Sequence, residues 1–337
     1  MSIAIGVIGV GMIGQDHIRR LTRAVAGAQV VAVTDVDVDR TRQVAASLPV
    51  PATAHGSGAD LIDDPQVQAV MVTSWGPTHE EYVLAALAAG KPVFCEKPLA
   101  TTQDACRRII DAEVAGGRRL LQVGYMRRYD AAFRAVKEVI DSGDIGQPLM
   151  VHSRHRNPTV PDFYTREMAI TDTAVHDFDA ARWLLGEELV SVAVRTPRQN
   201  RHGGELQDPL LMLLESSSGA LVDVETSVNI RYGYDIQTEV VGEDGTVAIA
   251  DTAPVLVRRA GTVAGRVPAD WSERFGPAYT VELQEWVDGL ADSGTAAGPS
   301  AWDGYAAAVV SDAAVAALHS GWVEPIELGD QPVFYRG

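Results

Sequence analysis

Three polar side chains recur on one predicted helix in the middle of the chain. Asp172, His176 and Asp179 lie at positions i, i+4 and i+7 of a helix predicted over 172–185, and Trp183 extends the same stripe. The unperturbed pKa of an imidazole suits proton removal near neutral pH, and a carboxylate one turn earlier can orient the imidazole or a substrate hydroxyl. The spacing predicts a general base with its orienting acid, although a structural histidine beside two surface acids fits it equally well.

A lysine follows directly on a predicted strand. Glu96, Lys97 and Pro98 come after the apolar run 92–95, and open α/β sheets bind their ligands at the carboxyl ends of the strands. A lysine at this edge can bind a substrate oxygen. Without that context, a Lys-Pro pair would more simply be a solvated lysine before a helix-starting proline.

A glycine-rich turn near the start of the chain predicts a nucleotide site. Residues 9–14 read Gly-Val-Gly-Met-Ile-Gly between a predicted strand and a predicted helix. Gly9 permits the tight turn, Gly11 lets phosphates approach the amides at the helix N-terminus, and Gly14 lets helix and strand pack closely. The same glycines could serve only a tight turn, so the end of the next strand decides between the two interpretations.

That strand ends at Asp35, where a carboxylate can accept hydrogen bonds from the hydroxyls of an adenosine ribose. The same carboxylate would repel the 2′-phosphate of NADP, and Val36 follows in place of a compensating arginine. The pattern therefore predicts NAD as the cofactor. Arg40 could still approach the ribose, which leaves the use of NADP open.

A parallel sheet must position these residues. Short β-branched runs alternate with amphipathic segments in the first third of the chain, as is typical of β-α-β units. Thr78 and Glu81 fit a capping box before a helix over 82–89, and Gly90 stands where a left-handed residue would end that helix. The predicted strands cover 3–9, 30–34, 69–73, 92–95 and 120–123.

The pattern changes after Gly124, which predicts a boundary between an NAD-binding domain over 1–123 and a second domain over 124–337. In the second domain, apolar runs separated by turn signals predict an antiparallel sheet, including a hairpin turn at 243–245. The expected strands cover 149–155, 210–215, 220–228, 236–241 and 246–250, and further helices cover 131–142, 278–290 and 301–319.

Composition narrows the partners of the protein. The formal net charge of -17, without a basic block, argues against nucleic acid as a partner. No apolar run approaches the roughly 20 residues of a membrane helix, and the first residues carry no basic leader. Cys95 and Cys106 do not suggest a disulfide framework, and cysteines and histidines show no metal-ligand spacing. We expect a cytoplasmic protein with a small neutral substrate, no metal and no membrane contact.

Together, the motifs resemble those of the Gfo/Idh/MocA oxidoreductases. The resemblance covers essentially the whole chain and includes the glycine turn, Glu96-Lys97-Pro98 and the Asp172-x-x-x-His176 pair. The other matching segments are TSWGPTH at 73–79, GYMRRYD at 124–130, HRNP at 155–158, YGYD at 232–235, GEDG at 242–245 and AWDGY at 301–305.

The resemblance implies an α/β fold, with an N-terminal doubly wound Rossmann domain followed by an α+β domain on a large open, mostly antiparallel sheet. The exposed face of that sheet would assemble a homotetramer. The catalytic group would be Lys97, Asp172 and His176. His176 would be the general base, Asp172 would hold His176 and the reacting oxygen, and Lys97 would stabilise developing negative charge.

The resemblance also implies two sets of binding residues. Among the implied substrate contacts, Arg127 could form a structural ion pair rather than bind the substrate, and Asn157 and Tyr234 could serve only packing. The implied cofactor contacts are Gly9, Gly11, Met12, Ile13, Gly14, Asp35, Val36, Ser74, Trp75, His79, Glu96, Lys97 and Met126. The implied substrate contacts are Lys97, Arg127, His155, Asn157, Asp172, His176, Asp179 and Tyr234 or Asp235.

Within the family, the chain is similar to members that oxidise inositols, which implies NAD-dependent oxidation of one hydroxyl of myo-inositol to a ketone. Another inositol stereoisomer or a pyranose sugar is an alternative, because the same polar groups can bind any ring of equatorial hydroxyls. The loop 159–164 has Pro-Asp where a glycine is expected, which bears on substrate identity. Two further alternatives are a non-catalytic NAD-sensing regulator, against which the three catalytic candidates argue together, and an NAD-dependent glycosidase, which the motifs fit less well.

Overall fold

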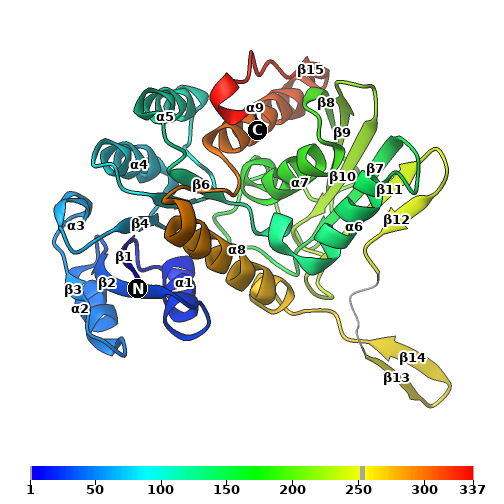
Figure 1. Ribbon diagram of the computed structural model, residues 1–337. Coiled ribbons are helices and arrows are strands. Elements are labelled where there is room, and N and C mark those ends of the chain that lie inside the picture. Colours follow the sequence, from blue (N-terminus) through cyan, green and yellow to red (C-terminus); the bar gives the residue numbers. More distant parts are fainter. Residues whose placement is uncertain (1, 251–254, 337) are drawn as a thin grey trace. The chain divides into compact units, whose positions relative to one another are not determined.

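The computed structural model describes residues 2–250 and 255–336. The chain forms two compact units (Figure 1). The first consists of Met1–Met126, Tyr279–Ala308 and Gly329–Gly337, and the second of Arg127–Ala278 and Val309–Leu328. The first unit thus includes two C-terminal segments that the sequence places in the second domain. The functional division at 123 into a cofactor domain and a substrate domain stays a prediction.

The first unit contains a six-stranded parallel sheet in the order β3-β2-β1-β4-β5-β6, which confirms the predicted doubly wound fold. The strand order reverses between β1 and β4, the place where such sheets bind ligands. The strands are β1 Ile3–Ile8, β2 Ala28–Thr34, β3 Thr53–Ala54, β4 Ala69–Val72, β5 Val93–Glu96 and β6 Leu121–Gly124. The helices are α1 Met12–Arg23, α2 Val38–Ser47, α3 Gly58–Asp63, α4 His79–Ala88 and α5 Gln103–Gly116, with short turns η1 Gly76–Thr78 and η4 Val333–Tyr335.

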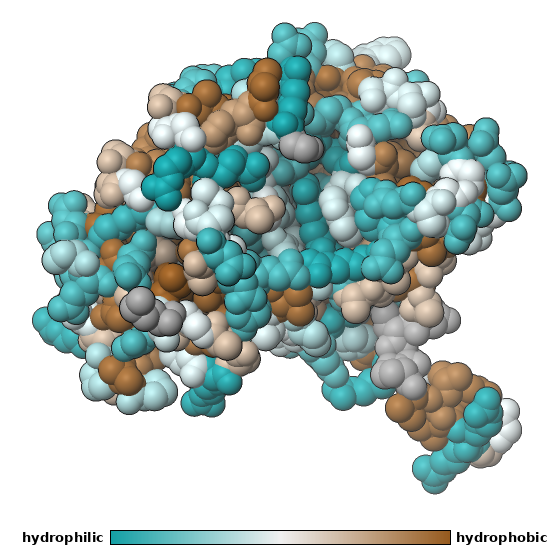
Figure 2. Space-filling model, viewed as in Figure 1, coloured by the Kyte–Doolittle hydropathy of each residue, from teal (hydrophilic) through white to brown (hydrophobic). Residues whose placement is uncertain are grey.

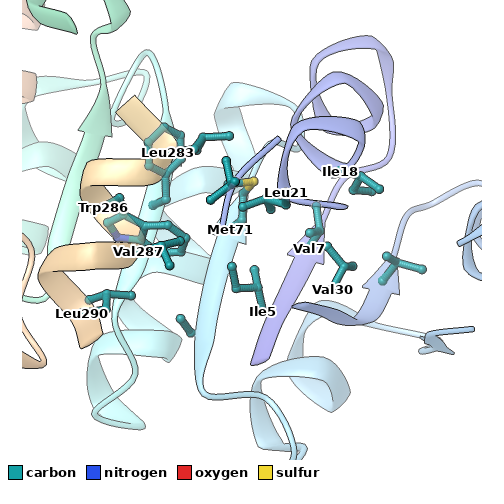
Figure 3. Packing of buried hydrophobic residues seen from close by; sticks show 14 of the residues in the cluster. Ile5, Val7, Ile18, Leu21, Val30, Met71, Leu283, Trp286, Val287 and Leu290 are labelled. Atoms are coloured by element: carbon teal, nitrogen blue, oxygen red, sulfur yellow. The ribbon is translucent and has the colours of Figure 1, made fainter. Parts of the chain in front are cut away.

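The core of this unit explains why a distant segment joins it. Ile5 of β1 and Met71 of β4 are buried against Leu283 and Trp286, which belong to helix α8, Trp271–Ser293. Figure 3 shows these side chains packed together beside the sheet. Full burial of one large apolar side chain stabilises a fold by about 1.5–3 kcal/mol. The apolar stripe of α8 therefore attaches its C-terminal part to the first unit.

The second unit contains a seven-stranded sheet in the order β12-β11-β7-β10-β9-β8-β15. Its strands are β7 Pro148–Arg156, β8 Leu189–Arg195, β9 Leu210–Ser216, β10 Leu221–Ser227, β11 Asp235–Gly242, β12 Thr246–Ala248 and β15 Val323–Pro325. The sheet is antiparallel except for the pair β7/β10, which is parallel. A parallel pair needs a long crossover connection, and the segment between these strands contains helix α7, Val175–Leu185.

The remaining elements are helices α6 Ala131–Ser142 and α9 Ala301–Ser320, the turn η2 Met126–Tyr129, and the two-stranded hairpin β13 Leu256–Arg259 and β14 Thr262–Gly265. The sequence did not predict this hairpin. No helix in the described ranges is long and apolar enough to cross a membrane. No group of three or more His, Cys, Asp or Glu side chains within those ranges is placed to hold a metal ion.

Two local predictions are wrong. The Thr78 side chain does not cap α4, because its hydroxyl donates to the Trp75 carbonyl at 2.7 Å and the helix starts from the turn η1. The expected α-helix over 172–185 begins instead with a π-helical segment, η3, Ala169–Ala174. Asp172 therefore sits on a wider turn than regular α-helical spacing assumes. Gly90 has φ of +68°, as its predicted place after α4 requires.

Candidate active site

The glycine turn between β1 and α1 leaves space beside the start of a helix. Gly9 has φ of +95°, and a Cβ at Gly14 would lie 2.0 Å from the Gly9 carbonyl oxygen. Only glycine allows this approach of strand and helix. A Cβ at Gly11, in contrast, would meet no atom within 4 Å. This open space lies beside the first backbone amides of α1, where a pyrophosphate fits.

A pocket of about 300 Å³ adjoins the glycine turn. The Asp35 carboxylate is fixed at its wall, because Oδ2 accepts from the Val10 amide at 2.7 Å and Oδ1 accepts from the Asp37 amide at 3.0 Å. An ionised carboxylate can accept about four hydrogen bonds, so two positions stay available for ribose hydroxyls. The pocket is lined by Ile8, Gly9, Thr34, Asp35, Val36, Gly56, Ser57, Gly58, Ser74, Trp75, Thr78 and Tyr82.

Large apolar side chains are exposed around this turn. Met12 is 75% exposed and Trp75 is 78% exposed, and Val36 is almost fully exposed. Exposed apolar side chains that gather at a pocket are typical of a ligand site. Ile13, next to Met12, is half-buried.

The loops after β4 and β5 are joined by a buried histidine. The ring nitrogens of His79 lie 2.7 Å from the Pro98 carbonyl oxygen and 3.0 Å from the Ser74 carbonyl oxygen. His79 is 1% exposed. The structure thus places this predicted cofactor contact inside the protein, between the two loops that carry Ser74 and Lys97.

Lys97 is half-buried and directly follows β5. The buried Glu96 accepts a hydrogen bond from the Lys97 amide at 3.1 Å, and its other oxygen lies 2.7 Å from Nε2 of His17. His17 is fully buried on α1. These contacts connect the backbone at Lys97 to the helix that follows the glycine turn. Sequence reasoning missed His17, although its place three residues after Gly14 marks the face of α1 that must meet the sheet.

The predicted acid and imidazole lie in the second unit, where η3 passes into α7. Asp172 is exposed and His176 is buried. The Tyr164 hydroxyl lies 3.3 Å from Oδ2 of Asp172, 2.8 Å from the Met168 carbonyl oxygen and 2.6 Å from Oγ1 of Thr173. Burial, together with the charge of Asp172, raises the pKa of Tyr164 and keeps the phenol neutral. The Asp172 carboxylate therefore lies beside a neutral hydroxyl and is accessible to a substrate.

A buried charged cluster lies close to His176. The ring of His155 is centred 6.5 Å from the ring of His176, and its Nδ1 lies 2.8 Å from Oδ2 of Asp177. Oδ1 of Asp177 accepts from Nη1 of Arg127 at 2.6 Å. Burial pushes the pKa of Asp177 up, but Arg127 and His155 outweigh this effect and hold the pKa below its usual value. Arg127 thus forms a buried ion pair, the alternative that the sequence left open.

Two further predicted contacts lie near this cluster. Tyr234 is buried, and its ring packs edge-on against His155 at 5.9 Å between centroids. Burial raises the pKa of Tyr234, so its hydroxyl stays protonated. Oδ1 of Asn157 is buried without a hydrogen-bond partner among the described residues, so it can accept a bond from a ligand hydroxyl.

Three predicted residues have other surroundings. The carboxylate of Asp179 accepts two hydrogen bonds from Arg128, at 3.0 and 2.5 Å. Asp235 lies 3.6 Å from Nη1 of Arg156, and because its neighbour Ile236 pairs with His155, Asp235 faces the opposite side of the sheet. The structure therefore brings Tyr234, and not Asp235, to His155. Met126 is buried at the start of η2.

Similarity to known proteins identifies the family. Residues 3–125 match the oxidoreductase family with an NAD-binding Rossmann fold, and residues 133–248 match the GFO/IDH/MocA C-terminal domain. The chain is 57% identical to inositol 2-dehydrogenase 3 of Saccharopolyspora erythraea, over 100% of this chain and 99% of that protein. It is 56% identical to inositol 2-dehydrogenase of Ralstonia nicotianae over the full length of both chains. The chain belongs to the Gfo/Idh/MocA family.

A solved structure of another family member supports the same conclusion. The myo-inositol dehydrogenase of Lactobacillus casei, in complex with NAD(H) and myo-inositol, is 40% identical to this chain. The two structures agree with a TM-score of 0.97 over 99% of this chain and 100% of the other. The predicted family, fold class and oxidoreductase function are confirmed.

The first unit of this Gfo/Idh/MocA protein is an NAD-binding Rossmann domain, and its side chains fit that cofactor. The open space at Gly11 suits a pyrophosphate, and the fixed carboxylate of Asp35 suits ribose hydroxyls. The residues that would hold NAD are the predicted ones of the glycine turn, the pocket wall and the loop after β5. Asp172, His176 and the polar groups described around them belong to the second unit.

Proposed function

We propose that this protein is an inositol 2-dehydrogenase, which oxidises the C2 hydroxyl of myo-inositol to the ketone 2-keto-myo-inositol with NAD⁺. One observation carries the proposal: the chain is more than half identical, over its full length, to proteins named inositol 2-dehydrogenase. The structure of the Lactobacillus casei enzyme, whose ligands are NAD(H) and myo-inositol, supports the substrate.

The proposed reaction needs a proton acceptor and a cation for the reacting oxygen. NAD⁺, when bound, supplies the acceptor for the hydride that leaves the substrate carbon. His176 takes the hydroxyl proton, and Asp172, which lies beside the Tyr164 hydroxyl, holds the substrate hydroxyl in place. Lys97 stabilises the negative charge that develops on the oxygen as the proton leaves. The electron pair of the O–H bond forms the second bond between carbon and oxygen in the ketone carbonyl.

The proposed substrate contacts differ in what they offer. Asn157 and Tyr234 supply neutral hydrogen-bonding groups, which suit an uncharged polyol. His155 is oriented by Asp177 and lies beside His176. Arg127 and Asp179, whose charges are paired with Asp177 and Arg128 in the structure, act by holding the site together rather than by contacting the ring.

The proposal includes assembly into a homotetramer in the cytoplasm. One face of the seven-stranded sheet exposes apolar side chains, among them Leu213 and Leu221 on adjacent strands, between charged side chains such as Arg154 and Asp223. The β13–β14 hairpin is also exposed and largely hydrophobic (Figure 2). Exposed apolar side chains that gather on a surface are typical of subunit contacts, and closed two-fold symmetry is the common arrangement of such subunits. Cys95 and Cys106 are buried and not disulfide-bonded, as suits a reducing compartment.

A substrate panel tests the proposed function. The purified protein is incubated with NAD⁺ and, in separate reactions, myo-inositol, scyllo-inositol, other inositol stereoisomers and pyranose sugars, and the formation of NADH is followed by absorbance. We expect the highest kcat/KM with myo-inositol. A preference for another stereoisomer or for a sugar would replace the proposed substrate. NADH binding without turnover of any polyol would instead support a regulator that has kept the fold.

A further inference from the structure

The guanidinium of Arg40 lies between two carboxylates that follow the end of β2. Nη2 of Arg40 lies 2.9 Å from Oδ2 of Asp37, and Nη1 lies 4.0 Å from Oδ1 of Asp35. Asp37 is the N-cap of α2, because its Oδ1 accepts from the Arg40 amide at 3.0 Å. The Asp37 amide in turn donates to Asp35 at 3.0 Å. One cluster therefore joins the cofactor carboxylate, a second carboxylate and a guanidinium.

This cluster lies where the two nicotinamide cofactors differ. NAD has a free ribose 2′-hydroxyl at the position of the extra phosphate of NADP, and Asp35 is the residue expected to face it. The Arg40 side chain is 43% exposed, so its guanidinium borders solvent beside that carboxylate. A guanidinium in such a place can bind a phosphate through two parallel hydrogen bonds. In the structure, however, Arg40 already donates to Asp37.

We propose that Arg40 is a latent phosphate-binding residue and that Asp37 is a second determinant of cofactor specificity, which holds and neutralises Arg40 so that the protein selects NAD. The inference rests on the proposed function in one respect, the placement of the adenosine ribose at Asp35. It adds to the sequence argument, in which Val36 stands in place of a compensating arginine. The positive charge needed for a phosphate is already present on Arg40, and the carboxylates of Asp35 and Asp37 neutralise it.

The Asp37 carboxylate both carries a charge and caps helix α2. The Arg40 amide, and then the Arg40 charge, lower the pKa of Asp37, so the carboxylate is ionised at neutral pH. Substitution by asparagine removes this charge while it retains a good N-cap for α2. Asp37→Asn therefore releases Arg40 without removing the helix cap. Arg42 offers a matched control, since it lies on the same helix, is 71% exposed and pairs with Asp39 at 3.5 Å.

The test measures equilibrium binding of NADH and NADPH by nucleotide fluorescence, with no need for turnover. Asp35→Ser should weaken NADH binding. The double variant Asp35→Ser with Asp37→Asn should bind NADPH about 10- to 100-fold more tightly than Asp35→Ser alone, the range for charge-assisted hydrogen bonds to a phosphate. Arg40→Gln added to the double variant should abolish this gain. Arg42→Gln added instead should leave it unchanged. A melting curve of each variant verifies that it is folded.

The possible failures are distinct. If Asp37→Asn adds no NADPH affinity to Asp35→Ser, or if Arg40→Gln and Arg42→Gln act alike, the inference about Arg40 is wrong while the proposed function stands. If the wild-type protein binds no NADH, or if Asp35→Ser leaves NADH affinity unchanged, the cofactor placement itself is wrong.

Discussion

The variant Asp177→Asn tests the structural role given to the buried cluster. The side chains of Arg127 and Asp177 are 1% and 0% exposed and form an ion pair at 2.6 Å. The substitution leaves the Arg127 charge buried without its counter-ion, which costs about 3–5 kcal/mol of folding free energy. In a unit of this size, each kcal/mol lowers the melting temperature by about 2–4 °C. We therefore expect the second unit to melt about 6–20 °C lower.

The same variant should change how stability depends on pH. The pKa of Asp177 is lower in the folded protein than the value of about 3.9 expected when unfolded. Ionised Asp177 thus stabilises the folded state above about pH 4, and this contribution disappears as the pH falls through the folded pKa. Asp177→Asn carries no such titration. Its melting temperature should fall less steeply than that of the wild type as the pH is lowered below about 4.

Differential scanning calorimetry of wild type and variant measures both effects. Asp141→Asn is the control, because Asp141 pairs with Lys137 on an exposed surface of α6 and is 58% exposed. That pair should contribute almost nothing to the melting temperature. Nucleotide fluorescence should show unchanged NADH binding in Asp177→Asn, since the proposed cofactor contacts lie in the first unit. The reasoning is refuted if Asp177→Asn melts no more than about 2 °C below the wild type, as a surface variant would.

Four further predictions follow from the proposed site. Lys97→Ala and His176→Ala should each lower kcat by about 10²- to 10⁴-fold with NAD affinity nearly intact, and near-normal turnover would contradict their roles. Asp35→Ser should raise KM for NAD about 10- to 100-fold, and an unchanged preference for NAD over NADP would show that Asp35 does not face the ribose. Gly14→Ala should abolish NAD binding, because its Cβ would clash with Gly9; calorimetric titration with normal affinity would contradict this. Light scattering should give the mass of a tetramer, and a monomer at micromolar concentration would exclude the proposed assembly.

The cofactor half of the protein was readable from sequence because its requirements are local. Gly9 needs a positive φ and Gly14 needs a missing Cβ, and each constraint involves neighbours in one β-α turn. Parallel strands also appear as short, fully buried apolar runs, so the first sheet could be predicted strand by strand. The comparisons confirm NAD and the family, whereas the individual contacts stay predictions.

The partners of the catalytic candidates could not be predicted in the same way. His17 meets Glu96 across 79 residues of sequence, and Arg127 meets Asp177 across 50. Such contacts depend on how elements that are distant in sequence pack together. The residue type alone does not show whether a charged side chain is buried in an ion pair or exposed to solvent. The π-helical segment that carries Asp172 is likewise invisible to a pattern that assumes 3.6 residues per turn.

The central claim, oxidation of myo-inositol at C2 with NAD⁺, is tested most directly by isotope transfer. The purified protein is incubated with NAD⁺ and myo-inositol that carries deuterium on C2, and both products are analysed by mass spectrometry. We expect the reduced cofactor to gain one deuterium and the polyol product to be an unlabelled ketone, in equal amounts. Reduced cofactor without deuterium would place the oxidation at another carbon, and no reduced cofactor would contradict the proposed dehydrogenase.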